Sequence, residues 1–368
     1  MTEMTIEQQI FTWFDHFHAN PEVSWKEYET TKKIASILEE LNVSYRLFGD
    51  IPGLVAEIGE GTDIVAVRAD IDALWQEVDG EWRANHSCGH DANITMVLGA
   101  LLRLRNEPLN HKVRFIFQPA EELGNGAVAS FERGAVDGVS HLFGVHLRPI
   151  EELPLGKITP AIHHGAAYFL EGKINGADAH GARPHQGNNS IDVVMAVHQM
   201  LNSLHFSPFE PHSAKLTKIV ADGGSTNIIP GGATFAMDIR AQSNQLLDDM
   251  KNAIEKGLES IENQFGVGLE WRFFDYTPGA EVSPEAAQMA KSAIIDTLGE
   301  NFCTNEVHTP GADDFHFYTV KKPELKAAMI GIGANLQPGL HHPKMTFDHT
   351  ALIDASKVLA AVLKKTPE

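Results

Sequence analysis

The sequence predicts an α/β protein, with a catalytic domain built on a mainly parallel sheet that carries helices on both faces. A smaller ferredoxin-like βαββαβ domain interrupts this sheet. In the first and last parts of the chain, compact apolar segments alternate with segments of helical periodicity. The middle part follows the order strand, helix, strand, strand, helix, strand. The length of 368 residues is enough for about two domains.

The strands expected in the catalytic sheet are short apolar runs with polar ends. The first ends in carboxylates, and the second alternates apolar and polar residues before it breaks at Pro119. Because helical segments separate them, these strands favour a parallel sheet covered on both faces. The four runs are residues 63–70 (DIVAVRAD), 111–122 (HKVRFIFQPAEE), 140–147 (SHLFGVHL) and 327–333 (AAMIGIG).

Two helices are expected in the first part of the chain. Residues 90–105 carry apolar side chains at helical spacing, which places His90 and Asp91 at a helix N-terminus. Ser24 and Glu27 fit a capping box for a helix that includes the segment TTKKIASILEEL.

The inserted domain divides the catalytic domain into two segments. The expected boundaries are residues 1–166 for the first catalytic segment, 167–278 for the inserted domain and 279–368 for the second catalytic segment. An inserted domain of this kind can swing as a lid over an active site.

Composition excludes several classes of partner. The chain has 29 Lys and Arg residues against 49 Asp and Glu residues, a net charge of −20, so it would repel nucleic acid and anionic membranes. It shows no signal peptide and no apolar run of about 18 residues, and we expect a cytoplasmic protein. Two cysteines are too few for a disulfide framework. Cys303 is most simply a packed residue, whereas Cys88 lies among polar residues.

Polar side chains follow several of the expected strands. Because ligands bind beyond the carboxyl ends of parallel strands, these side chains should meet there, together with Cys88 and His90. Thiolate, imidazole and carboxylate groups in one place indicate a transition-metal site. The side chains in question are Asp70, Asp72, Glu121, Glu122, His146, His341 and His342.

Each of these groups has a simpler interpretation when taken alone. A Glu pair can be a solvated loop, a His at a strand end can be hydrogen-bonded in the core, and CGHD can be a turn with a helix cap. Their common position at one sheet edge favours the metal site.

Five motifs in order resemble a known family. They are RADIDAL, HSCGHDAN, FQPAEELGNGA, FGVHLRP and LHHPKMTF, and together they span nearly the whole chain. The sequence is similar to the amidohydrolase branch of the dinuclear metallopeptidases, which contains N-acyl amino acid amidohydrolases, hippurate hydrolases, N-acetyldiaminopimelate deacetylases and auxin-conjugate hydrolases.

The resemblance implies a role for each motif. It implies two divalent transition-metal ions (zinc, manganese or cobalt), and Glu121, the first residue of the Glu pair, as general base. His342 receives no ligand role, although neighbouring histidines can be confused in a sequence. The implied ligands are Cys88, which could bridge the metals, His90, Glu122, His146 and His341. Residues that would orient these ligands, or else serve as strand-end and helix-cap residues, are Asp70, Asp72 and Asp91.

In the inserted domain, the resemblance gives three residues a role toward the substrate. His180 would polarise the substrate carbonyl, while Asn227 and Arg240 would hold its polar groups or carboxylate. The simpler interpretation is a loop His, a turn Asn and a surface Arg. Relatives occur as monomers and as dimers built through this domain, so a homodimer is possible.

Three residues depart from the pattern common in such enzymes. Trp75 replaces a Pro, Asn93 a His and His141 an acidic residue. None of them is an implied ligand, but they argue against transferring the substrate of any one relative.

The function expected is hydrolysis of the amide bond of small N-acyl amino acids or related conjugates by metal-activated water. One alternative is a dipeptidase or carboxypeptidase on the same scaffold. Another is a catalytically inactive protein that binds a metal or small molecule. A zinc nucleobase deaminase fits poorly, because the chain lacks a Pro-Cys-x-x-Cys segment.

Overall fold

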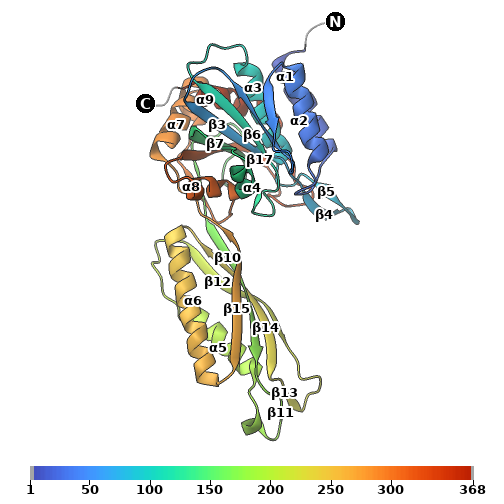
Figure 1. The fold of residues 1–368 in the computed structure, drawn as a ribbon, viewed down its shortest axis with the longest axis vertical. Coiled ribbons are helices and arrows are strands. Elements are labelled where there is room, and N and C mark those ends of the chain that lie inside the picture. The colour runs from blue at the N-terminus through green and yellow to red at the C-terminus, as the bar shows by residue number, and fades with distance from the viewer. Residues whose placement is uncertain (1–3, 366–368) are drawn as a thin grey trace. The chain divides into compact units, whose positions relative to one another are not determined.

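The computed structural model describes residues 4–365, which form two compact units (Figure 1). The catalytic unit contains the described residues up to His163, Glu281–His308, and those from Asp314 onward. The insert unit contains His164–Ala280 and Thr309–Asp313. The insert unit therefore includes a short return segment, Thr309–Asp313, that no pattern in the sequence indicates.

The catalytic unit is built on a seven-stranded sheet with the order β1-β2-β6-β3-β7-β17-β8. Its four inner strands β6, β3, β7 and β17 run parallel, while β1, β2 and β8 pair antiparallel toward the edges. This mainly parallel sheet confirms the predicted fold class. The bounds are β1 Ser44–Leu47, β2 Leu54–Ile58, β3 Ile64–Asp70, β6 Lys112–Gln118, β7 Val139–Pro149, β8 Ile158–Thr159 and β17 Lys326–Leu336.

Helices cover both faces of this sheet because its inner strands are apolar on both sides. In β3, Val65 and Val67 pack into one core cluster and Ile64 and Ala66 into another. The first cluster includes residues of α1 (Ile6–Ala19), α2 (Tyr28–Glu40), α3 (His90–Leu104), α7 (Pro284–Leu298) and α9 (Ala351–Lys364). The second includes residues of α4 (Gly126–Glu132) and α8 (Phe317–Lys321).

Helix α3 carries two predicted site residues at its start. Gly89, the residue before the helix, has a φ of +84°, a left-handed turn that glycine adopts without strain. His90 and Asp91 occupy the first turn, as predicted, and both are wholly buried. The helix packs against α9, α1 and β3, so its N-terminus is fixed rather than loose.

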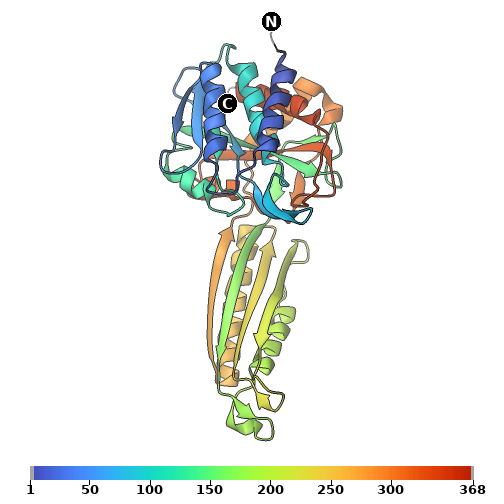
Figure 2. The ribbon, with the colours of Figure 1, turned by 90° about the vertical axis from the view of Figure 1, so that its right-hand side faces the viewer.

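The insert unit is an antiparallel four-stranded sheet in the order β12-β14-β10-β15. Its helices α5 and α6 pack against one face, as Figures 1 and 2 show, and the other face is open. The bounds are β10 Ala166–Asn175, α5 Ser190–Ser203, β12 His212–Ala221, β14 Gly232–Ala241, α6 Asn244–Phe265 and β15 Gly268–Thr277.

The two ends of the insert unit differ. At one end, His164 and Ala280 are hydrogen-bonded to each other where the chain enters and leaves the unit. At the other end, β11 (Ala179–His180) pairs with β13 (Ile228–Ile229) in a small two-stranded ribbon (Figure 1).

The predicted capping box at Ser24 and Glu27 is wrong. Helix α2 begins at Tyr28, and the side chain of Glu27 makes no capping bond. Glu22 instead accepts a hydrogen bond from the Thr30 amide at 2.7 Å. The polar side chains of Ser24 and Glu27 are therefore available for other contacts.

A few short elements lack a clear sequence pattern. They include the hairpin β4–β5 and the pair β9–β16. The bounds are β4 Leu74–Val78, β5 Glu81–Asn85, β9 Ile162–His164, β16 Val307–Thr309 and the 3₁₀ turns Pro184–Gln186, Glu300–Phe302 and Asp314–His316.

In the described part of the chain, no helix combines the length and apolar character that a membrane crossing requires.

Candidate active site

The polar groups expected at the strand ends come together at the carboxyl edge of the parallel strands. Strand β3 ends at Asp70, and His146 lies in the second half of β7, opposite Gly331 of β17. Glu121 and Glu122 follow β6 in the loop before α4. Parallel strands share one carboxyl edge, which is why residues distant in sequence meet here.

Five side chains offer metal-binding atoms within a small volume. The Cys88 Sγ atom lies 3.6 Å from His146 Nε2. The two carboxylate oxygens of Glu122 lie 3.4 Å from His341 Nε2 and 3.9 Å from His90 Nε2. These are the five residues that the resemblance implies as ligands, and the structure brings them together.

The donors fall into overlapping groups. Cys88 with His90 and His146 forms one, and Cys88 with Glu122 and His341 forms another, with all donor atoms of each group within 4.8 Å of one another. Cys88 belongs to both groups. A thiolate has lone pairs for two ions, so this arrangement suits two neighbouring metal positions that share Cys88.

Two buried atoms in the cluster lack the hydrogen bonds that such atoms normally make. His90 Nε2 and Glu122 Oε1 have no hydrogen-bond partner among the described residues, and they face each other. A divalent cation would satisfy both atoms at once. Imidazole and thiolate donors favour a transition metal over calcium or magnesium.

The electrostatics of Cys88 fit the same interpretation. Burial, with the nearby Glu122 carboxylate, raises the pKa of the Cys88 thiol well above its usual range. A neutral thiol is a poor ligand, so binding of a cation would have to displace its proton.

Asp72 orients two of these donors. His90 Nδ1 lies 3.0 Å from the Asp72 carbonyl oxygen and 3.1 Å from Asp72 Oδ1. With its proton on Nδ1, the ring directs the Nε2 lone pair toward the other donors. Asp72 Oδ2 accepts hydrogen bonds from Ser24 Oγ at 2.7 Å and from the Glu122 amide at 3.0 Å.

Asp70 belongs to a buried ionic network beside the donors. The wholly buried Arg68 guanidinium pairs with both Asp70 and Asp314, the latter at 2.8 Å. Asp70 Oδ1 lies 3.8 Å from His90 Nδ1 and accepts a hydrogen bond from Asn93 Nδ2 at 2.7 Å. Asn93, a departure from the common pattern, therefore supports the site through Asp70.

Asp91 connects the start of α3 to α1. Its carboxylate accepts a hydrogen bond from the Ala92 amide at 2.8 Å and lies 2.7 Å from His18 Nδ1. The hydrogen bond to Asp91 raises the pKa of His18. These contacts hold the helix that presents His90.

Glu121 and Glu122 both approach His90. Glu121 Oε2 lies 3.8 Å from His90 Nε2, close to the distance found for Glu122. Distances from His90 therefore do not separate a ligand from a general base. The preceding Ala120 has a φ of +52°, a left-handed conformation that is uncommon for a residue with a Cβ.

The remaining predicted residues lie in the insert unit. His180 and Asn227 sit together at the β11–β13 ribbon, where the Gly181 amide donates to the Asn227 carbonyl at 2.7 Å. Arg240 lies near the end of β14, where its guanidinium makes two hydrogen bonds to Asp238, at 2.9 and 3.2 Å. The two positions are at opposite ends of the sheet.

The other two residues that depart from the family pattern, His141 and Trp75, lie apart from the metal-binding side chains. His141 is five residues before His146 on β7, roughly 16 Å along a strand, and contacts Glu285 at 3.0 Å. Trp75 lies on β4 with 59% of its surface exposed, so it is not part of the hydrophobic core.

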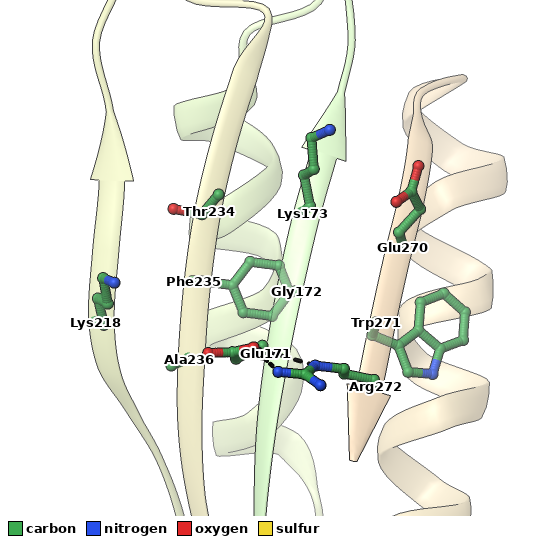
Figure 3. Close-up of a pocket in the computed structure, with 10 residues that line it drawn as sticks. All are labelled: Glu171, Gly172, Lys173, Lys218, Thr234, Phe235, Ala236, Glu270, Trp271 and Arg272. Atoms are coloured by element: carbon green, nitrogen blue, oxygen red, sulfur yellow. Dashed lines mark hydrogen bonds and ion pairs between the residues drawn. The ribbon is translucent and has the colours of Figure 1, made fainter. Parts of the chain in front are cut away.

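A hollow on the open face of the insert sheet contains none of the predicted site residues (Figure 3). Its volume is about 480 Å³, and exposed charges of both signs line it. An ion pair of 2.8 Å between Glu171 and Arg272 crosses it. Exposed pairs of this kind contribute little energy, and this hollow is not the candidate active site.

Sequence analysis missed several supporting residues. Arg68 had a usable signal, because a charged residue inside an otherwise apolar parallel strand requires a buried partner. His18 and Ser24 had no such signal, because their partners Asp91 and Asp72 lie 73 and 48 residues away in the sequence.

Fold and donor set together define a two-unit α/β protein with a candidate metal centre at the edge of a parallel sheet. The model of "Peptidase family M20/M25/M40" matches residues 66–365, and the chain belongs to this family. The expected family and the expected enzyme class, a metal-dependent amidohydrolase, are confirmed.

Relatives of known description cover nearly the whole chain. N-acetylcysteine deacetylase of Bacillus subtilis is 32% identical, covering 98% of this chain and 97% of its own. IAA-amino acid hydrolase ILR1-like 6 of Arabidopsis thaliana is 33% identical, covering 95% and 78%. The crystal structure of the Bacillus subtilis YXEP protein, described as a dinuclear metal-binding peptidase of the M20 family, aligns with a TM-score of 0.82 at 28% identity, covering 97% of both chains.

The shared position of Cys88 generates a prediction about metal content. We expect Cys88→Ala to lower the transition metal retained by protein purified without chelator, because both donor groups lose a member. Elemental analysis measures this. Cys303→Ala, which changes the chain's other cysteine, should retain the metal of the unaltered protein. Full occupancy in Cys88→Ala would contradict the ligand assignment.

Proposed function

We propose that this chain hydrolyses the amide bond of small N-acyl amino acids or related conjugates with two divalent transition-metal ions. The single observation that carries the proposal is the cluster of five donors in two groups that share Cys88, with the Glu121 carboxylate beside them. The names of the relatives, which act on N-acetylcysteine and on amino acid conjugates, support the substrate class.

Five side chains would hold the metals. When bound, the ions supply Lewis-acid activation of the attacking water and of the scissile carbonyl. Zinc, manganese and cobalt all suit the mixed donor set. The proposed ligands are Cys88, His90, Glu122, His146 and His341.

His341 is the better choice of the two adjacent histidines. Its Nε2 atom faces Glu122 at 3.4 Å, whereas the His342 Nδ1 atom accepts a hydrogen bond from the Lys344 amide at 3.1 Å. A φ of +65° at His341 turns the chain here, and Gln76 Nε2 donates to its carbonyl at 2.9 Å.

We assign the proton transfers to Glu121. In this assignment its carboxylate takes a proton from the attacking water and delivers it to the departing amine. Its side chain is 12% exposed, so it is shielded from bulk solvent but still accessible to a substrate. Glu122, at 9% exposure and between two imidazoles, is better placed as a ligand.

Exchanging each Glu for Gln separates these roles. Glu121→Gln should reduce kcat by about 10⁴-fold or more while metal content barely changes, because one group serves in two proton transfers. Glu122→Gln should instead lose metal and recover part of its activity at high metal concentration. Turnover of acetyl, benzoyl and longer acyl amino acids, beside dipeptides, is measured together with metal content.

The outcome decides both the roles and the substrate class. Loss of metal in Glu121→Gln with full occupancy in Glu122→Gln would reverse the assignment. Faster turnover of dipeptides than of every acyl amino acid would favour the dipeptidase alternative.

Arg240 is our candidate for holding the substrate carboxylate. Asp238 engages two of the five guanidinium N–H groups, which leaves three for another anion. Arg240 also lines a cavity of about 220 Å³ in the insert unit, together with Ser213 and Gln242.

Truncation of Arg240 should therefore act on substrates with a carboxylate. Arg240→Ala should lower kcat/KM for N-acyl amino acids. The loss should correspond to about 2 to 4 kcal/mol of transition-state stabilisation, as expected when a charged contact that the bound substrate buries is removed. An acyl amide without a carboxylate should be much less affected. Equal losses on the two substrates would indicate general misplacement rather than recognition of the anion.

His180 and Asn227 cannot serve the same substrate molecule as Arg240 within one insert unit. The strand from Gly232 to Arg240 alone spans roughly 27 Å, longer than a small N-acyl amino acid. If both ends act on the substrate, they belong to two copies of the chain. We therefore propose a homodimer in which each active site takes His180 and Asn227 from the partner copy.

The edge strand β12 supports this dimer. It lies at the edge of the insert sheet and exposes Ile219 and Val220, at 52% and 55%. On the neighbouring helix α5, Ile191 and Met195 are also exposed. An open edge with apolar side chains is a ready surface for pairing with a second copy.

Mixed dimers test the exchange of residues. Glu121→Gln and His180→Ala are each expected to be inactive alone. When the two are co-expressed, random pairing should restore about a quarter of the activity of the unaltered protein, because half of the dimers are mixed and each has one complete site. No recovery in demonstrably mixed dimers would show that His180 acts within its own chain, and full activity of His180→Ala alone would show that His180 has no role in the reaction.

A further inference from the structure

The segment before α2 contacts the loop that carries both site glutamates. The sequence indicated that Ser24 and Glu27 cap α2, but Glu22 satisfies the Thr30 amide instead. Ser24 donates to Asp72, and Glu27 is wholly buried although it bears a carboxyl group. A buried polar group of this kind needs a partner whose position it then fixes.

The partner of Glu27 is the residue that precedes Glu121. Glu27 Oε1 accepts a hydrogen bond from the Ala120 amide at 2.7 Å. Ala120 has the left-handed φ of +52°, which is unfavourable for a residue with a Cβ. The Ala120 carbonyl in turn accepts from the Gly126 amide at 3.1 Å, so both sides of this residue are held.

The loop has little room to relax around this conformation. A Cβ added at Gly126 would lie 1.7 Å from the Pro119 carbonyl oxygen, so the start of α4 packs directly on the backbone before Ala120. The Glu121 carbonyl accepts from the Gly124 amide at 2.7 Å. The direction in which Glu121 and Glu122 leave the backbone is therefore set at Ala120.

We propose that Glu27 is a positioning residue, whose buried carboxyl group holds Ala120 in the conformation that directs Glu121 and Glu122 into the site. This inference rests on the proposed function, because it assigns Glu27 a role toward the groups that we propose as base and ligand. Glu27 itself acts only through the Ala120 peptide.

The carboxyl group of Glu27 performs this role without an obligatory charge. Burial and the neighbouring Asp72 carboxylate raise its pKa to about 8. A side-chain amide of the same length keeps an oxygen atom that can accept the hydrogen bond from the Ala120 amide.

A matched pair of substitutions tests the proposal. Glu27→Met keeps the volume but removes the acceptor, and Glu27→Gln keeps an acceptor. We expect Glu27→Met to lower kcat by about 10- to 100-fold and to weaken metal binding, with KM little changed, as for the loss of other groups that orient ligands. Glu27→Gln should retain most of the activity and metal affinity at neutral pH.

Glu22→Ala is the control for loss of stability. It removes the bonds from Glu22 to Thr30 at the start of α2 without touching the loop of Ala120, so kcat should stay unchanged even if the melting temperature falls. Should Glu27→Met fail to fold, Glu27→Asp provides the same test, because its carboxyl group is one methylene too short to reach the Ala120 amide.

Two results would overturn the proposal: unchanged kcat and metal affinity in folded Glu27→Met, or losses in Glu27→Gln as large as those in Glu27→Met. Metal affinity is measured by titration of the metal-free protein with zinc. Since this titration needs no substrate, it tests Glu27 even if the unaltered protein hydrolyses no N-acyl amino acid, an outcome that would count against the proposed function alone.

Discussion

Negative charge buried at the carboxyl edge of the seven-stranded sheet is the constraint on which the rest of this structure depends. Asp70, Asp72 and Asp91 are all wholly buried there. An unpaired carboxylate in such surroundings would cost several kcal/mol, so each must find a cation or a set of donors. Arg68 offsets Asp70, imidazole and amide groups bind Asp72, and His18 binds Asp91. Among the proposed ligands, His90 Nε2 and Glu122 Oε1 keep buried polar atoms without a hydrogen-bond partner, and a divalent cation between them would supply one.

The parallel sheet makes this concentration possible because it supplies rigid positions at one edge. His146 is fixed in the middle of the sheet by pairing of β7 with β17, and His90 is fixed by a helix that is buried along almost its whole length. Side chains on such elements hold their geometry better than side chains on loops. Cys88, the two glutamates and His341 come from loops, and residues with positive φ lie at or directly beside them: Gly89, Ala120 and His341.

The sequence was sufficient for the parts of this architecture that depend on local patterns. Periodicity located the inner strands and α3, and the strand-end rule brought His146 and the glutamates together. Prediction from the sequence failed where one local pattern is compatible with two different structures. Ser24 and Glu27 have the spacing of a capping box, yet their partners Asp72 and Ala120 are 48 and 93 residues away. No short-range pattern encodes such contacts, nor the distance between the two ends of the insert sheet.

The supports of the site also extend beyond the region that identifies the family. The family model matches residues 66–365, whereas His18, Ser24 and Glu27 all precede it. Each of them hydrogen-bonds a residue of the matched region that lies next to a proposed ligand or the proposed base. Helix α1 and the segment before α2 therefore supply hydrogen-bond partners that the buried polar groups of Asp91, Asp72 and Ala120 would otherwise lack. The proposed ligands and the proposed base all lie in the matched region, but several hydrogen bonds to the residues around them come from the segment before it.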